Sequence, residues 1–388
     1  MAMDFALFYE IPVARPWGPR SEYDAYRHAV DAAVLGDQLG FHSFWTVEHH
    51  FLEEYSHCSS PEALYGMVAA KTKRIRIGHG VRLLPFPYNH PVRAAESAAV
   101  LDLLCDGRLE FGTGRSSTRA ELEGFGIDPH RTRQLWEEGL DMVVRAWTED
   151  EFAWESDLFR IPKRRVLPKP FQHPHPPLWG ATSSPESHRI MGQKGMGLLS
   201  FTIGTPPEEL KQRIDLYREG LAERRPPVGK FVNPRAATFT MVHCAEDAAR
   251  ARREAARSFE WYARAGTAAV ASVSKWMRET GRESGTYAYG DALADLDTSF
   301  LTFDFLESSG ACIVGDPEQC VATAERYEAA GCDLLLCLVQ PYAMDYDAVL
   351  RSIELLGTKV LPHFRDGAYP HQIAGHAAVP TAVRAAGA

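Results

Sequence analysis

"RIRIGHGVRLLPFPYNHPVRAAESAAVLDLLCDGRLEFGTGR", residues 74–115, contains one full unit of the pattern that determines the fold. Apolar residues dominate 74–84, a helix-length segment follows at 91–104, and a second apolar run occupies 109–114. A strand, a helix and another strand in this order are typical of a βαβ unit with two parallel strands. The stretch therefore predicts a parallel sheet covered by helices.

The same alternation continues towards both ends of the chain. Strands are predicted at 5–11, 43–47, 74–84, 109–114, 177–182, 197–201, 236–243 and 332–339. Helices are predicted at 22–39, 61–71, 91–104, 131–147, 206–223, 316–331 and 346–356, and two more begin at 185 and 246. A doubly wound open sheet would need a reversal of the chain, which this alternation does not contain. The sequence predicts an α/β fold of the (β/α)8 TIM barrel type.

Two stretches interrupt the alternation. Residues 148–177 are rich in proline, which is excluded from helix interiors and central strands, so they predict an insertion after the fourth strand. A second insertion is predicted at 274–297, near the last barrel units. We expect residues 1–365 to form a single barrel domain and the weakly patterned residues 366–388 to form a C-terminal tail.

Composition narrows the class of protein. The 388 residues include 42 basic and 51 acidic side chains, a net charge of −9, and no basic stripe interleaved with aromatics, so we expect no nucleic-acid partner. No apolar run has the length that a membrane helix needs, and "MAMDFALFYEI" at the amino terminus predicts a strand rather than a signal peptide. The seven cysteines are scattered and odd in number. Reduced thiols and a cytoplasmic location are therefore expected.

In a barrel, functional residues follow the carboxyl ends of the strands. Four polar stretches occupy such positions: "EHH" at 48–50, "GVRLLPFPYNHP" at 80–91, "GTGRSSTR" at 112–119 and "GATSSPES" at 180–187. These stretches are the candidates for the site.

Two of the stretches suit an anion. Gly112 and Gly114 allow close approach of a ligand, and Arg115 offers a planar fork for a phosphate or carboxylate, although it could also form an ordinary salt bridge. Thr182, Ser183 and Ser184 precede a proline at the start of a predicted helix, where free N–H groups attract an anion. An ordinary N-cap by Ser184 explains the same pattern. Together the two stretches favour a phosphate site at one rim.

The two adjacent histidines, His49 and His50, point to opposite sides of an extended chain and therefore do not suit one shared metal ion. The "HPH" at 173–175 has alternate spacing but lies in the proline-rich insertion. We expect no metal site. His49 suits a base or a hydrogen-bond partner for a reaction, with Glu48 either orienting it or forming a salt bridge elsewhere. A hydrogen-bonded core histidine is the alternative for His49, and His50 is assigned to structure.

Taken together, these stretches resemble the bacterial luciferase-like flavin monooxygenase family. The "EHHF" at 48–51, the block at 83–115 and the "ATSSPES" at 181–187 occur in that family's order and spacing. The resemblance extends from residue 4 to about 201, and more loosely from 313 to 356. It implies a (β/α)8 barrel that binds reduced FMN from a separate flavin reductase and uses O₂.

The resemblance also implies roles for individual residues. Arg115, Ser183 and Ser184 fall on the flavin phosphate, and Gly80 and Val81 fall where the family has a non-prolyl cis peptide beneath the flavin ring. His49 matches a histidine that the light-emitting enzymes need for activity. Gly114, Thr182 and Phe201 complete the predicted flavin site, which comprises the following residues: Gly80, Val81, Gly114, Arg115, Thr182, Ser183, Ser184 and Phe201. Gly114 departs from the luciferase catalytic chain, which has a reactive cysteine there, so we do not expect light emission.

These observations predict an FMN-dependent two-component monooxygenase that oxygenates a small hydrophobic organic substrate by hydroxylation, epoxidation or Baeyer–Villiger insertion. Its expected catalytic residues are His49 and Glu48. Two alternatives stay open: a deazaflavin-dependent oxidoreductase of the same superfamily, and a flavin-binding protein without turnover. We further expect a homodimer, formed through the helix at 91–104 and the preceding helix near 62–70.

Overall fold

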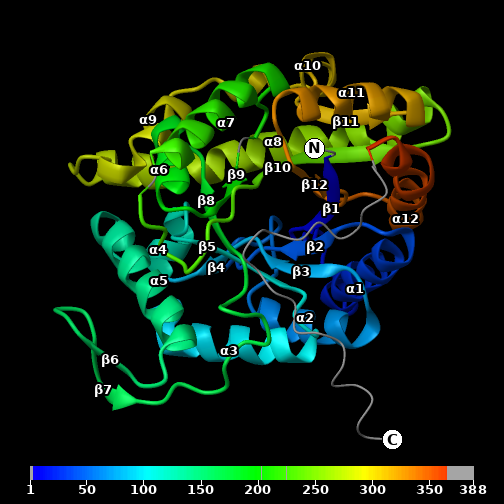
Figure 1. Cartoon of the computed structure of the whole chain (residues 1–388). Helices are drawn as coiled ribbons and strands as arrows, with labels where there is room; N and C mark the ends of the chain where they lie inside the picture. The colour runs from blue at the N-terminus through cyan, green and yellow to red at the C-terminus, as the bar shows by residue number, and fades with distance from the viewer. Residues whose placement is uncertain (1–2, 202, 224, 365–388) are drawn as a thin grey trace, which may run out of the picture.

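Eight parallel strands close into a barrel, seen in Figure 1 with the helices arranged around it. The computed structural model describes residues 3–201, 203–223 and 225–364. The barrel strands are β1 (Asp4–Tyr9), β2 (Ser43–Thr46), β3 (Arg76–His79), β5 (Leu109–Gly114), β8 (Leu178–Thr182), β9 (Gly197–Ser200), β10 (Ala236–Cys244) and β12 (Leu334–Leu338). The ring closes because β1 pairs with both β2 and β12, while β10 pairs with both β9 and β12. The predicted (β/α)8 barrel is confirmed.

Helices cover the outside of the barrel (Figure 1). The longer helices are α1 (Ser21–Leu39), α2 (Pro61–Lys71), α3 (Pro91–Leu104), α5 (Thr132–Thr148), α6 (Pro185–Gln193), α7 (Pro207–Ala222), α8 (Ala248–Glu279), α11 (Pro317–Ala329) and α12 (Tyr346–Leu355). The shorter helices are α4 (Arg119–Gly124), α9 (Tyr289–Ala294) and α10 (Phe303–Ser309). Gly40 ends α1 in the left-handed conformation, with φ of 82°, as its position after the apolar pattern predicts.

Large side chains fill the interior of the barrel. Trp45 and Trp179 are fully buried, and their rings meet edge to face with centroids 5.6 Å apart. Gly78 pairs with Trp45 across β2 and β3, and the Trp45 ring occupies the space that a side chain at Gly78 would need. Glu110 accepts a hydrogen bond from the Trp179 indole and pairs with Arg76 at the amino-terminal end. The interior is thus a packed core, and the opposite end is left for a site.

The predicted strand at 74–84 is wrong as a single element. It consists of β3 and a short β4 (Arg82–Leu83), separated by a cis peptide bond between Gly80 and Val81. Gly112 of β5 packs so closely on the carbonyl of His79 that a side chain at Gly112 would overlap it. Pairing with β5 therefore stops at Gly78 and resumes at Arg82.

The first predicted insertion is confirmed. Between α5 and β8 the chain forms an antiparallel hairpin, β6 (Phe152–Glu155) and β7 (Arg160–Arg164), which projects from the barrel in Figure 1.

The second insertion begins later than the predicted residue 274, because α8 continues to Glu279. Val273 and Met277 are buried in a small apolar cluster with Tyr287, and the Ser274 hydroxyl donates to the Tyr287 carbonyl at 2.7 Å, so this part of α8 supports the insertion above it. A further strand, β11 (Cys312–Gly315), pairs with the end of β10 and was not predicted. Residues 366–388, the predicted tail, lie outside the described residues.

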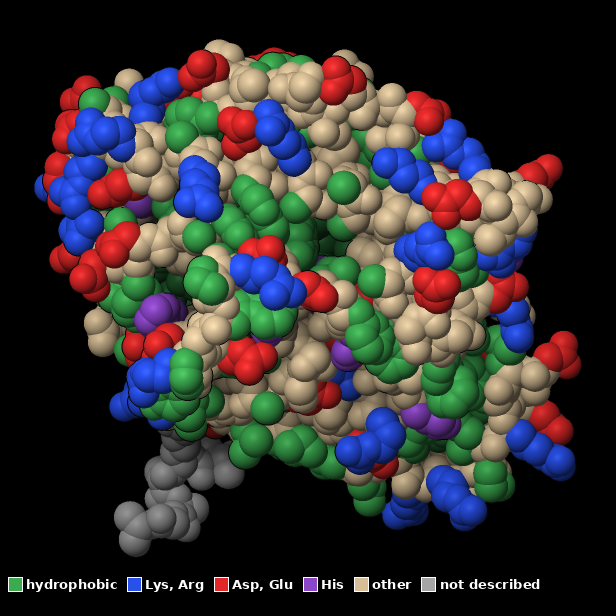
Figure 2. All heavy atoms as spheres, turned by 180° about the vertical axis from the view of Figure 1, so that it is seen from behind, with side chains coloured by type: hydrophobic (Ala, Val, Ile, Leu, Met, Phe, Trp, Pro, Cys, Tyr) green, Lys and Arg blue, Asp and Glu red, His purple; other side chains and the backbone are tan. Residues whose placement is uncertain are grey.

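Basic and acidic side chains are interspersed on the face shown in Figure 2. Within the described ranges, none of the helices combines the length and the apolar character that a membrane crossing requires. All seven cysteines fall in these ranges, where they are free and buried.

Candidate active site

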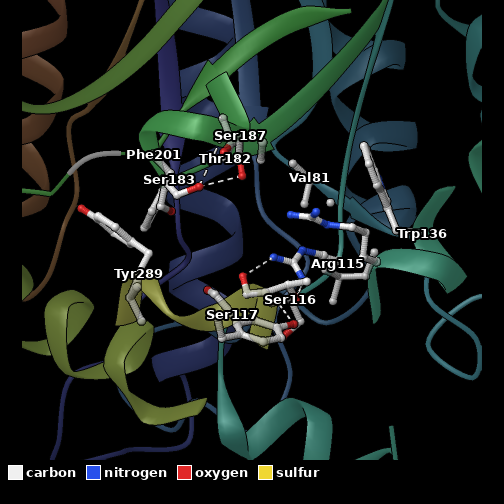
Figure 3. Close-up of a pocket in the computed structure, with 18 of the residues that line it drawn as sticks. Val81, Arg115, Ser116, Ser117, Trp136, Thr182, Ser183, Ser187, Phe201 and Tyr289 are labelled. Atoms are coloured by element: carbon white, nitrogen blue, oxygen red, sulfur yellow. Dashed lines mark hydrogen bonds between the residues drawn. The ribbon is translucent and has the colours of Figure 1, made fainter. Parts of the chain in front are cut away.

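A cavity of about 1250 Å³, including its open mouth, lies at the carboxyl ends of the barrel strands. Every residue predicted for the site lines it: Glu48, His49, Gly80, Val81, Gly114, Arg115, Thr182, Ser183, Ser184 and Phe201. In Figure 3, Thr182, Ser183 and Ser187 face Arg115 and Ser116 across an open space, and Phe201 and Tyr289 flank it. The fold thus brings together polar groups that are more than 150 positions apart in the chain.

Two arginines make one part of the cavity positive. The Arg115 guanidinium donates to the Thr132 hydroxyl at 3.1 Å and to the Thr286 carbonyl at 3.0 Å, and lies 4.5 Å from the centre of the Tyr287 ring. Burial and the nearby Arg133 both lower the pKa of Arg115 below its usual value, and the Tyr287 ring opposes this effect. Arg133, from the first turn of α5, lines the same cavity, and its guanidinium forms no hydrogen bond or ion pair with another described residue. The pair can hold a dianionic group such as a phosphate monoester.

The start of α6 contributes hydroxyl groups to the cavity. Ser184 is the N-cap, because its hydroxyl accepts from the backbone N–H of Ser187 at 3.3 Å, so the ordinary capping role weighed for it is confirmed. Its hydroxyl also contacts the Ser187 hydroxyl at 2.7 Å. Ser183 and Thr182 line the cavity beside this cap. A helix start whose hydroxyls line the same cavity as two arginines favours an anion.

Glycine residues form a flat wall at the ends of β3 and β5. The Gly80–Val81 peptide bond is cis, as the resemblance implied, and the Gly80 N–H donates to the Thr46 carbonyl at 2.8 Å. A Cβ at Gly114 would lie 2.8 Å from Cγ2 of Val81. Without moving Val81 the wall therefore has no room for a cysteine at Gly114, and a planar ring could lie against its backbone.

His49 is held by two buried acids. Its Nδ1 lies 2.8 Å from Oε1 of Glu121, the third residue of α4, and its Nε2 lies 3.7 Å from Oε2 of Glu10, which follows β1. Glu121 also accepts hydrogen bonds from the hydroxyls of Ser116 and Thr118. The His49 side chain is 18% exposed, whereas both carboxyls are fully buried.

These acids determine the charge of His49. Burial disfavours the charged ring, but the carboxyls of Glu121 and Glu10 outweigh burial and raise the pKa of His49 to about 9. The same ion pair lowers the pKa of Glu121 despite its burial, while burial raises the pKa of Glu10. The raised pKa favours the charged imidazole ring at neutral pH.

Glu48 does not orient His49, which corrects one of the two roles considered for it. Its carboxylate accepts from the backbone N–H of Leu83 at 2.9 Å and from the Asn89 amide at 2.8 Å. It lies 3.7 Å from the Arg82 guanidinium, the salt bridge that was the alternative. Glu48 lines the cavity, but its bonds hold β4 in place.

His50 points away from the cavity, as strand alternation predicts. Its ring packs in one cluster with Tyr88 and Phe125, with centroids 6.1 Å and 4.9 Å away, and its Nε2 is 3.5 Å from Glu48. In the proline-rich insertion, His175 is buried and its Nε2 accepts from the Lys230 backbone N–H at 2.9 Å. Both histidines thus serve structure.

The family model described as luciferase-like monooxygenase matches residues 3–334. The chain belongs to this family. Limonene 1,2-monooxygenase of Rhodococcus erythropolis is 27% identical over 84% of this chain and 79% of that enzyme. The oxygenase component of the flavin-dependent trigonelline monooxygenase of Acinetobacter baylyi is 28% identical, over 54% of this chain and 57% of that protein.

Solved structures agree with this assignment. The monooxygenase RslO1 of Streptomyces bottropensis superposes with a TM-score of 0.74 at 26% identity, covering 94% of this chain and all of that one. An F420-dependent secondary alcohol dehydrogenase superposes with a TM-score of 0.69 at 19% identity, over 94% of this chain and all of that one. That second likeness shows the fold alone. Luciferase-like monooxygenases and F420-dependent enzymes share it, so the barrel does not decide the cofactor.

Several residues of this luciferase-like site were not predicted. They are Glu10, Glu121, Arg133, Trp136, Thr286, Tyr287 and Tyr289. The spacing of Thr118 and Glu121 is that of a capping box, which could have placed Glu121 in the first turn of a helix after the fourth strand. No local signal could have shown that Glu121 faces His49. The tyrosines come from the second insertion, which has little periodicity.

Proposed function

We propose that this protein is the oxygenase component of a two-component system, which binds reduced FMN from a separate flavin reductase and oxygenates a small hydrophobic organic substrate. The observation that carries this proposal is one cavity in which two arginines, a glycine wall and His49, held by two buried acids, meet. The cytoplasm, where such a reductase would operate, is the proposed location.

The residues present fit FMN. Arg115 and Arg133, with the hydroxyls before α6, would hold the phosphate, and the Gly80–Val81 peptide and Gly114 would face the ring. Reduced FMN supplies the two electrons with which one atom of O₂ enters the substrate and the other leaves as water. His49 would donate a hydrogen bond at the reacting oxygen atoms. Apolar side chains such as Val47 and Phe201 would exclude water from them.

The relatives support the same chemistry. The trigonelline enzyme is described as flavin-dependent and as an oxygenase component, which implies a reductase partner for that protein. Limonene is a hydrocarbon, and the apolar walls of the present cavity suit a substrate of that class. Hydroxylation, epoxidation and Baeyer–Villiger insertion remain the reactions proposed.

Anaerobic titration tests the cofactor. We expect reduced FMN to bind with at least about tenfold higher affinity than reduced riboflavin, because only FMN offers a phosphate to the arginines. Preferential binding of reduced deazaflavin cofactor would contradict the proposal and favour the hydride-transferring alternative. Tight FMN binding without any effect on the reaction of the flavin with O₂ would indicate a binding protein without turnover.

A further inference from the structure

Glu10 is a fully buried acid that the proposed reaction does not yet use. It follows β1 at the carboxyl end of the barrel, and its Oε1 accepts from the Tyr262 hydroxyl of α8 at 2.8 Å. Its Oε2 is buried, has no hydrogen-bond partner among the described residues, and lies 3.7 Å from Nε2 of His49. One carboxyl oxygen of Glu10 thus has a hydrogen-bond partner, and the other faces His49, the candidate catalytic residue.

A purely structural role does not explain this arrangement. Burying a carboxylate away from water is costly unless both oxygens are paired, and glutamine would accept from Tyr262 equally well. The distance of 3.7 Å is too long for a direct hydrogen bond but short enough for a strong electrostatic interaction with a charged imidazole. The unpaired oxygen therefore points to an interaction with His49.

The surroundings of His49 are acidic and aromatic on several sides. Glu121 approaches Nδ1 from α4, Glu10 approaches Nε2 from β1, and Glu48 adjoins His49 in the chain. The Tyr55 ring meets the imidazole edge to face at 5.9 Å and stacks on Tyr262 at 5.2 Å. Each of these three carboxyls favours the charged ring, and the two phenols are neutral because burial raises their pKa values.

We propose that Glu10 is a positioning residue for His49, which together with Glu121 keeps a proton on each ring nitrogen and so makes His49 a donor rather than a base. Nδ1–H donates a hydrogen bond to Glu121, and the Glu10 carboxyl stabilises the proton on Nε2 electrostatically, at 3.7 Å, without a direct hydrogen bond. That proton stays available to an oxygen atom of the bound reactants. This inference rests on the proposed function, because it assigns a donor role within that reaction.

The variant Glu10→Gln tests the interaction, since it keeps the acceptor for Tyr262 and removes the charge. Its first measurement is the titration of His49 by NMR in the protein without flavin or substrate, with the signal assigned by its loss in His49→Gln. We expect the midpoint to fall by about one pH unit or more. Glu10→Asp moves the carboxylate away from His49 by one methylene and should lower the His49 midpoint by a smaller amount. This variant replaces Glu10→Gln in the test if Glu10→Gln does not fold.

A matched control is available on α8. Glu254 bonds to Nε2 of His243 at 2.7 Å, so Glu254→Gln also removes an acid from a histidine. Glu254→Gln should leave the His49 midpoint unchanged. A His49 midpoint that stays in place in the Glu10 variants, or that moves equally in Glu254→Gln, would overturn the proposal.

The second measurement is the pH profile of oxygenation with reduced FMN. The alkaline decline of activity should move to lower pH in Glu10→Gln by the same amount as the NMR midpoint, and an unmoved profile would overturn the donor role. If the protein does not alter the reaction of reduced FMN with O₂ at any pH, the proposed function fails and the donor role fails with it. The NMR titration would then still decide whether Glu10 controls the charge of His49.

Discussion

At the scale of single residues, the pair formed by His49 and Glu121 is the centre of the proposed site. Replacing His49 by alanine would leave two buried carboxyls, Glu121 and Glu10, without the imidazole that faces them, and would therefore also cost stability. A substitution that keeps one donor is therefore the better test. His49→Gln can still donate to Glu121 but cannot carry a charge.

We predict that His49→Gln lowers product formation by roughly 100-fold, the usual contribution of a positioned acid–base group, while FMN affinity stays within about twofold. The oxygen consumed should be released as hydrogen peroxide, measured alongside product.

The control is His50→Ala. The His50 ring packs on Tyr88 and Phe125, so this substitution should lower the unfolding free energy by about 1–3 kcal/mol, with little change in turnover per folded molecule. Equal turnover by both variants would remove His49 from catalysis.

Arg133 offers the cleaner test of the phosphate site, because Arg115 also bonds to the Thr132 hydroxyl and the Thr286 carbonyl. Arg133→Ala should weaken FMN binding by about 10-fold to 150-fold, equivalent to roughly 1.5–3 kcal/mol, and leave riboflavin binding unchanged. Calorimetry with both ligands measures this difference. Arg131→Ala, an exposed neighbour that does not line the cavity, is the control. A similar loss for riboflavin would place the phosphate elsewhere.

At this scale the sequence predicted those site residues that follow the barrel strands directly. It missed the site residues that lie on the helices and insertions between strands. Every predicted residue lines the cavity, because the carboxyl ends of barrel strands converge. Glu121 and Arg133 lie on helices after β5, and their direction depends on how α4 and α5 pack. Periodicity locates a helix but does not show which groups in its first turn reach a site.

At the scale of elements, the interruption between β3 and β4 shapes the glycine wall. Alternation of apolar residues could not reveal it, because Val81, Leu83 and Leu84 continue the strand pattern through the break. The information lies in β5, where Gly112 and Gly114 leave space for the approaching chain. Likewise, α8 extends beyond its predicted end because Val273 and Met277 are buried by the insertion itself.

Substitution of the two glycines tests this account. Gly112→Ala should lose at least about 3 kcal/mol of unfolding free energy, because the new methyl group would overlap the backbone carbonyl of His79. Gly114→Ala meets only Cγ2 of Val81 and should cost less, and Val81→Ala in the same chain should restore most of that loss. Chemical denaturation gives these values. Equal stability of Gly112→Ala and the unchanged protein would refute the close approach of β3 and β5.

At the scale of the whole molecule, α2 and α3 present an apolar surface. Met67 on α2 and Val100, Leu103 and Leu104 on α3 are each more than 40% exposed. Exposed apolar surfaces of this kind are typical of protein–protein interfaces. Since the sequence analysis also expected both helices at a dimer interface, we predict a homodimer through α2 and α3.

Light scattering at micromolar concentration should give twice the mass of the chain, and Leu104→Glu with Val100→Glu should give the monomer. Val232→Glu, at an exposed apolar position outside both helices, should leave the dimer intact. A monomeric unchanged protein would contradict the prediction.

The barrel as a whole could be predicted because each of its eight units repeats one local pattern, so errors in single boundaries do not alter the count. The insertions could be located but not described, since the hairpin of β6 and β7 packs on α5 and the helix α9 packs on α8. The cavity draws Thr286, Tyr287 and Tyr289 from the second insertion. Substrate choice should therefore depend most on the part of the chain that was hardest to predict.

The central claim is that this cavity controls the reaction of reduced FMN with O₂. The most direct measurement mixes the anaerobic complex of the protein and reduced FMN rapidly with O₂ and follows flavin reoxidation and hydrogen peroxide together. The account predicts that hydrogen peroxide appears at least about tenfold more slowly than from free reduced FMN, and that His49→Gln removes most of this delay. Reoxidation and peroxide release identical to those of the free flavin would contradict it.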